Sequence, residues 1–120
     1  MHNYRELKVW RESIQMAKEV YILTRKFPRE EMFQLTSQIR RAAVSVASNI
    51  AEGCGRRTNK DLVHFLDIST GSAFELDTQL AIALELGYIN KGLYDNITSQ
   101  IDQVQKMLYR LTESFINKKK

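Results

Sequence analysis

The sequence predicts an all-α protein, an antiparallel up-down-up-down four-helix bundle that forms one domain over residues 1–120. Three observations predict this class. The chain has five glycines and one proline among 120 residues, too few turn formers for a β-sandwich or barrel. Apolar residues recur at alternating steps of three and four, which is typical of helices. The segments between these stretches are short, so consecutive helices are expected to run antiparallel.

The first predicted helix follows Asn3, which can cap it, and ends at Phe27 because the ring of Pro28 disfavours helical backbone in the residue before it. Its predicted apolar stripe consists of Leu7, Trp10, Ile14, Ala17 and Tyr21. The second predicted helix spans residues 28 to about 52 and stops at the glycines Gly53 and Gly55. Its predicted stripe consists of Leu35, Ile39, Ala42, Val46 and Ile50.

The third predicted helix begins after Thr58, which forms a capping pair with Asp61, and ends at Gly87. Its predicted stripe consists of Leu62, Leu66, Ser69, Ala73, Leu76, Leu80 and Leu84. Residues 90–96 lead into the fourth helix, whose predicted stripe consists of Ile97, Ile101, Val104, Leu108, Leu111 and Phe115. We expect the last three residues, Lys118–Lys120, to be a disordered tail.

The second and third helices carry apolar and small residues away from these stripes. Five of them are predicted to contact another copy of the chain: Ala43, Ala47, Ala51, Val63 and Phe74. We therefore expect a homo-oligomer of closed symmetry. The alternative interpretation is that alanine is simply a good helix former and that single exposed apolar side chains are ordinary.

The sequence shows no convergent set of catalytic groups, and we expect neither enzymatic activity nor a cofactor. Asp61, His64 and Asp67 have a spacing that can hold a metal on one helix, but metal-binding bundles direct such ligands inward, and the core stripes here are apolar. A solvated charged face is the better interpretation. Cys54 has no neighbouring base in the sequence, so it is interpreted as an ordinary thiol at a helix end.

Positive charge is the more informative feature. The chain has 18 basic and 14 acidic residues, a net charge of +4. The segment from residue 40 to residue 60 is richer in cations than the chain as a whole, and part of it surrounds the start of the third helix, where free backbone N–H groups favour an anion. The candidate nucleic-acid-binding residues are Arg40, Arg41, Arg56, Arg57 and Lys60. The alternative is that these cations only solubilise a loop or pair with acids.

Several strings of the sequence resemble the four-helix-bundle family encoded in intervening sequences of bacterial 23S rRNA genes. They are LKVW at residues 7–10, LTSQIRRAAVS at 35–45, SNIAEG at 48–53 and LGYI at 86–89. The resemblance covers nearly the whole chain. It implies a homopentamer without enzymatic activity, similar also to the accessory protein of diversity-generating retroelements, which works with a reverse transcriptase. It also implies basic positions at Arg40, Arg41 and Arg56, and a signature of unsettled role at Asn49, Glu52 and Gly53.

Together these observations predict a protein of the cytoplasm without a membrane segment, because the single cysteine cannot form an internal disulfide and no apolar run is long enough to span a bilayer. The predicted partners are further copies of the chain and structured RNA, either 23S rRNA or its precursor. The alternative function is a protein adaptor or accessory subunit for a nucleic-acid enzyme such as a reverse transcriptase.

Overall fold

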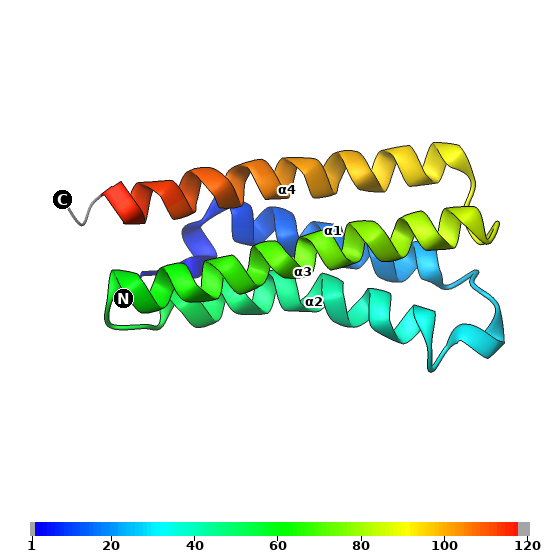
Figure 1. Cartoon of the computed structure of the whole chain (residues 1–120), viewed down its shortest axis with the longest axis horizontal. Helices are drawn as coiled ribbons and strands as arrows, with labels where there is room; N and C mark the ends of the chain where they lie inside the picture. Colours follow the sequence, from blue (N-terminus) through cyan, green and yellow to red (C-terminus); the bar gives the residue numbers. More distant parts are fainter. Residues whose placement is uncertain (1, 118–120) are drawn as a thin grey trace.

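A computed structural model describes residues 2–117, and within that range the protein is built of helices without strands. Four α-helices follow in order: α1 (Lys8–Thr24), α2 (Leu35–Cys54), α3 (Asn59–Glu85) and α4 (Lys91–Asn117). Short 3-10 helices, η1 (Tyr4–Glu6) and η2 (Arg29–Glu31), precede α1 and α2. Figure 1 shows that consecutive helices run antiparallel along a molecule of 48 × 24 × 20 Å. This confirms the predicted four-helix bundle, whereas the predicted tail Lys118–Lys120 lies outside the described residues.

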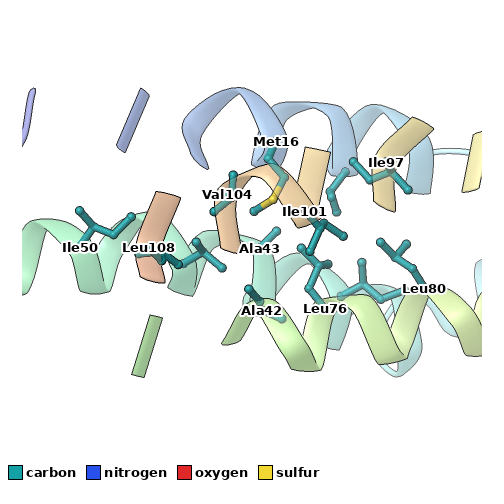
Figure 2. Close-up of a cluster of buried hydrophobic side chains, with 14 of the residues drawn as sticks. Met16, Ala42, Ala43, Ile50, Leu76, Leu80, Ile97, Ile101, Val104 and Leu108 are labelled. Atoms are coloured by element: carbon teal, nitrogen blue, oxygen red, sulfur yellow. The ribbon is translucent and has the colours of Figure 1, made fainter. Parts of the chain in front are cut away.

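All four helices contribute to the hydrophobic core (Figure 2). Each helix packs against its neighbours in sequence, and α1 also packs against α4. The predicted stripes of the last three helices are confirmed, because nearly all of their members are buried and the remaining three, Leu35, Leu84 and Leu111, are half-buried. Each fully buried leucine or isoleucine stabilises the fold by roughly 1.5–3 kcal/mol, so these stripes supply most of the driving force for folding.

The stripe predicted for the first helix is wrong in part. Leu7, Trp10 and Ala17 are half-buried against the core, but Ile14 and Tyr21 are exposed. The buried face of α1 consists of Val9, Ser13, Met16, Val20 and Thr24. The hydroxyls of Ser13 and Thr24 donate to backbone carbonyl oxygens one turn earlier, at 2.7 Å and 2.8 Å. A hydroxyl that is hydrogen-bonded within its own helix can be buried, so two polar residues interrupt the hydropathy pattern of a face that belongs to the core.

Helix α2 begins later than predicted. Residues 29–31 form η2, residues 32–34 form a turn, and α2 begins at Leu35. Gln34 has φ −125° and ψ −107°, which is not helical, and the N–H of Leu35 donates to Oε1 of Glu31 at 3.3 Å. The connection between α1 and α2 is therefore longer than the sequence pattern indicates, and Phe33 lies in it.

The predicted boundaries of the third helix are confirmed. Oγ1 of Thr58 accepts a hydrogen bond from the N–H of Asp61 at 3.1 Å, so these residues form the expected cap. After α3, Gly87 adopts φ +78°, and its N–H and that of Tyr88 donate to carbonyl oxygens of the last helical turn. Helix α4 begins at Lys91, earlier than the stripe indicates, because Oδ1 of Asn90 accepts the N–H of Leu93 at 2.8 Å.

The prediction that Ala43 and Ala47 face away from the core is wrong. Ala43 is 0% exposed and Ala47 is 5% exposed within the single chain. Both are therefore covered by other helices of the same chain. A methyl group carries little hydropathy signal, so the spacing of alanines does not show which side of a helix is covered. These two residues belong to the intramolecular core.

The other residues predicted for an oligomer contact remain on or near the surface. Ala51 and Val63 are half-buried, and Phe74 is 59% exposed. None of the helices within residues 2–117 combines the length and the hydropathy that crossing a bilayer requires.

Candidate nucleic-acid interface

The turn between α2 and α3 presents three of the predicted basic residues at one end of the bundle (Figure 1). Helix α2 ends at Cys54, and the N–H of Arg56 donates to the carbonyl oxygen of Gly53 at 3.0 Å. Helix α3 begins immediately after the Thr58 cap. The connection is therefore short and hydrogen-bonded at both sides, which fixes the direction in which its side chains leave the bundle.

Gly53 allows the two helices to approach each other at this turn. A Cβ atom at Gly53 would lie 3.1 Å from the carbonyl oxygen of Leu62 and 3.1 Å from Cβ of Phe65, both on α3. Such contacts are tighter than side-chain packing normally allows, so a side chain here would require Leu62 or Phe65 to shift by a few tenths of an ångström. This assigns a packing role to one residue of the family-like signature.

The other two signature residues also organise α2 and α3. The Asn49 side-chain amide donates to the carbonyl oxygen of Ser45 at 2.8 Å and to its hydroxyl at 2.9 Å. That hydroxyl lies 2.8 Å from the Ser72 hydroxyl of α3. Glu52 pairs with Arg56, with 2.6 Å between Oε2 and Nη2. The signature residues thus hold the end of α2 against α3 and orient the first arginine of the turn.

The three cations at the turn differ in their surroundings. The guanidinium of Arg56 stacks over the Phe65 ring at 4.5 Å and is neutralised by Glu52. Arg57 and Lys60 are exposed, and neither has a carboxylate partner within residues 2–117. They lie beside the first turn of α3, where the helix dipole is positive and Thr58 caps one of the free N–H groups. These two side chains are therefore the cations of the turn that are available to a ligand.

Arg40 and Arg41 form a second basic group on α2. They lie about 20 Å from the turn, given a rise of about 1.5 Å per residue. Nε of Arg40 donates to the Thr24 hydroxyl at 2.9 Å, and its guanidinium lies 4.6 Å from the centre of the Tyr21 ring. Arg41 is exposed. The predicted basic residues therefore form two separate groups rather than a continuous patch.

No group of three His, Cys, Asp or Glu side chains within residues 2–117 is arranged to hold a metal ion, and this includes Asp61, His64 and Asp67. His64 is exposed, and its ring makes an edge contact with the ring of Phe65, with 5.3 Å between the two centroids. Cys54 is buried at the end of α2, and burial raises the pKa of its thiol. A thiol of this kind is a weak nucleophile.

The family model of 23S rRNA-intervening sequence proteins matches residues 5–110 of this sequence. The chain belongs to this family. The match includes the α2–α3 turn, the signature residues and both basic groups. A comparison with curated protein sequences gives no match.

A solved structure supports the same fold. A crystal structure of a protein with unknown function from the S23 ribosomal protein family of Bacteroides thetaiotaomicron is similar, with a TM-score of 0.81 and 24% sequence identity. The similarity covers 88% of this chain and 95% of the other. At 24% identity this similarity shows that the two proteins share a fold, and it does not show what either protein does.

The surroundings of Arg40 and Arg41 could not be predicted from the sequence. These arginines line a groove of about 530 Å³ together with Tyr21, Met32, Phe33, Ser37, Val44 and Ser45. Phe33 is 89% exposed, the most exposed of the large hydrophobic side chains described. The exposure of Phe33 is not predicted, because the sequence pattern places residues 28–34 in a helix. The signal that identifies it is an aromatic residue between Pro28 and the first apolar residue of the stripe, Leu35.

Proposed function

We propose that this chain is a non-enzymatic, oligomeric helical-bundle protein of the cytoplasm that binds structured RNA, with 23S rRNA or its precursor as its RNA. The observation that carries this proposal is a pair of exposed cations, Arg57 and Lys60, that lie beside the first turn of α3 without a carboxylate partner within residues 2–117. Cations at a helix start suit the phosphate groups of a nucleic-acid backbone. The family's connection with 23S rRNA supports the choice of RNA.

The proposed interaction recognises backbone and shape. A-form RNA offers side chains a phosphate-lined surface, and proteins bind double-stranded RNA mostly through such contacts. The turn offers the charges of Arg57 and Lys60 and backbone N–H groups, while Arg56 is engaged by Glu52 and Phe65. Repetition of the turn by symmetry in an oligomer multiplies the number of cations that meet one RNA molecule, which raises affinity.

Oligomerisation, with five copies as the family resemblance implies, is part of the proposal. Its support is a row of exposed apolar side chains along α3, which is the apolar surface left after Ala43 and Ala47 of α2 are assigned to the core. This row consists of Phe74, Ile82 and Leu86. Large exposed apolar side chains that recur along one helix favour a surface that another molecule covers.

The test is a binding titration with a 12-base-pair RNA duplex and with a 23S rRNA transcript at several salt concentrations. We expect the variant Arg57→Ala/Lys60→Ala to bind both RNAs more weakly, by about tenfold or more for each cation removed, because a charged hydrogen bond contributes about 1.5–3 kcal/mol. The slope of log affinity against log salt should fall by about one for each phosphate that the variant no longer neutralises.

The matched control is Lys18→Ala/Lys106→Ala, which removes the same charge from exposed positions on α1 and α4. We expect this variant to bind both RNAs nearly as well as the unmodified protein does. The proposal fails if the unmodified protein binds neither RNA, or if both double variants weaken binding equally.

A second candidate function is an accessory subunit that docks on a nucleic-acid enzyme such as a reverse transcriptase. The observation that favours it is the same exposed row on α3, which a protein partner would cover as well as a second copy would. Nuclease treatment separates the two functions: an enzyme that stays bound to the chain after complete RNA digestion supports the accessory role. Loss of the enzyme together with the RNA supports RNA binding.

A further inference from the structure

The groove around Arg40 and Arg41 combines features that the proposed RNA-binding turn lacks. Four of its lining side chains are large, apolar or aromatic, and exposed, namely Tyr21, Met32, Phe33 and Val44. Its two charged lining residues are both arginines, and no acidic residue among residues 2–117 lines it. The groove therefore presents exposed apolar surface and unbalanced positive charge side by side.

Hydrogen bonds of Glu31 anchor the chain just before Phe33. The Glu31 carboxylate accepts a hydrogen bond from the Tyr88 hydroxyl at 2.8 Å and another from the N–H of Leu35, and the ring of Tyr88 packs against Phe27. The hydrogen bond to Glu31 raises the pKa of Tyr88 above its ordinary value. Glu31 is thus engaged outside the groove, and the residue that projects from the same short turn is Phe33.

Arg40 and Arg41 differ in how firmly their side chains are held. The hydrogen bond to Thr24 and the stacking on Tyr21 fix the position of Arg40. Its terminal guanidinium nitrogens, and the whole guanidinium of Arg41, have no hydrogen-bond acceptor within residues 2–117. Five N–H donors on an arginine match the oxygens of a phosphate. The groove therefore places unused phosphate donors next to an exposed aromatic face.

From this arrangement we propose that the groove binds one unpaired nucleotide of an RNA strand, with the base stacked on Phe33 and its phosphate held by Arg41 and Arg40. Single-stranded nucleic acids are bound in this way elsewhere, by aromatic rings that stack on bases and cations that follow the backbone. The volume of about 530 Å³ is in the range of sites that enclose small organic ligands. The inference rests on the proposed RNA-binding function and adds a preference for RNA with unpaired bases near a duplex.

The experiment compares two probes, a 12-nucleotide oligouridylate and a 12-base-pair RNA duplex, by fluorescence anisotropy. We expect Phe33→Ala to weaken binding of the oligouridylate by about 5- to 150-fold, which corresponds to about 1–3 kcal/mol for one stacked base. Binding of the duplex should change less than about twofold, because a paired base offers no free face. Phe33→Trp should restore the affinity for oligouridylate. Phe33 is almost fully exposed, so its substitution is expected to leave folding intact.

Tyr109→Ala is the matched control. Tyr109 is a similarly exposed ring on α4 and lines a groove with Lys106 and Arg110, but that groove also contains the carboxylate of Asp102. We expect this variant to bind both probes as the unmodified protein does. Equal losses of affinity for oligouridylate in the Phe33 and Tyr109 variants would overturn the proposal, because any exposed ring would then bind a base equally well.

Further outcomes separate this inference from the proposed function. If the unmodified protein binds the duplex and Phe33→Ala leaves both affinities unchanged, the groove proposal is overturned and RNA binding stands. If the unmodified protein binds neither probe, both fail. If Phe33→Ala instead lowers the mass of the assembly in light scattering, the groove is a contact between copies or proteins, and the nucleotide proposal is overturned.

Discussion

Gly53 and Gly71 are both helical glycines, but a side chain would meet different surroundings at the two positions. At Gly53 a Cβ atom would contact the backbone and Phe65 of α3 at 3.1 Å, whereas at Gly71 it would find nothing within 4 Å. Glycine in a helix interior costs about 0.5–1 kcal/mol relative to alanine. At Gly53 the close approach of two helices offsets this cost, while at Gly71 no contact within the described residues does.

The substitution of these glycines by alanine should therefore have opposite effects. We expect Gly71→Ala to stabilise the protein by about 0.5–1 kcal/mol through helix propensity. Gly53→Ala should destabilise it by about 1–2 kcal/mol, because overpacking against a backbone atom outweighs the same gain. Urea unfolding at one fixed protein concentration measures both, since an oligomer's apparent stability depends on concentration. A shift of the Gly53→Ala midpoint to higher urea would contradict the close packing described for the turn.

At the scale of the helices, hydrogen bonds of side chains to the backbone act differently at an end and in the middle. Thr58 caps α3 by accepting the N–H of Asp61, which has no partner within its own helix. Thr78, in the middle of α3, donates its hydroxyl to the carbonyl oxygen of Phe74 at 2.9 Å, which already serves the helix. The first bond supplies an acceptor for a backbone N–H that would otherwise lack a hydrogen bond. The second adds a further donor to a carbonyl oxygen that already accepts a hydrogen bond within the helix.

Replacing the two threonines by alanine tests this distinction. We expect Thr58→Ala to destabilise the protein by about 1 kcal/mol and Thr58→Ser to retain most of the stability. Thr78→Ala should be neutral or slightly stabilising, because alanine has the higher helix propensity. Thermal unfolding followed by circular dichroism reports both changes. Equal losses for the two alanine variants would show that the cap contributes nothing of its own.

At the scale of the whole molecule, the distribution of charge matters more than its sum. Three of the 18 basic residues are Lys118–Lys120, so residues 1–117 carry 15 basic and 14 acidic residues. Beyond its first turn α3 carries only acidic charges, whereas α2 carries Arg40 and Arg41 and is acidic only at Glu52. The proposed binding of RNA therefore depends on where cations are concentrated, at the α2–α3 turn and at the groove, since the net charge over the described fold is small.

The proposed assembly has a direct measurement in light scattering on dilute protein. We expect a mass that is a multiple of 14.0 kDa, with five copies giving about 70 kDa. Phe74→Glu should lower this mass, because it introduces a charge into the exposed row on α3 next to Glu75. Tyr109→Glu, which alters an exposed ring on α4, should leave the mass unchanged. A stable 14.0 kDa species for the unmodified protein would refute oligomerisation.

The parts of the fold that local chemistry decides could be predicted from the sequence. The Thr58 cap and the turn at Gly87 depend on a few neighbouring residues, and both are confirmed. The stripes of α2, α3 and α4 are also confirmed, because large aliphatic side chains at helical spacing leave little choice of buried face. The cations of the α2–α3 turn could also be identified, because they flank a helix start that local residues predict.

The errors share a different origin. On α1 the buried face includes Ser13 and Thr24, whose polarity is satisfied within the helix, whereas hydropathy alone favours the competing face with Ile14. Ala43 and Ala47 are buried although alanine is indifferent to burial. Phe33 lies beside the arginines only because α1, the 28–34 segment and α2 meet there. None of these follows from spacing along one segment.

The sequence by itself determined that this protein has four antiparallel helices, which large side chains face the core, and where the cations flank a helix start. Those features depend on helical periodicity and on hydrogen bonds between near neighbours. Only the tertiary structure decided which face of α1 is buried, how closely α2 approaches α3 and what surrounds Arg40. These depend on which surfaces of different helices exclude water from each other, a choice that small and polar side chains leave open until the helices pack.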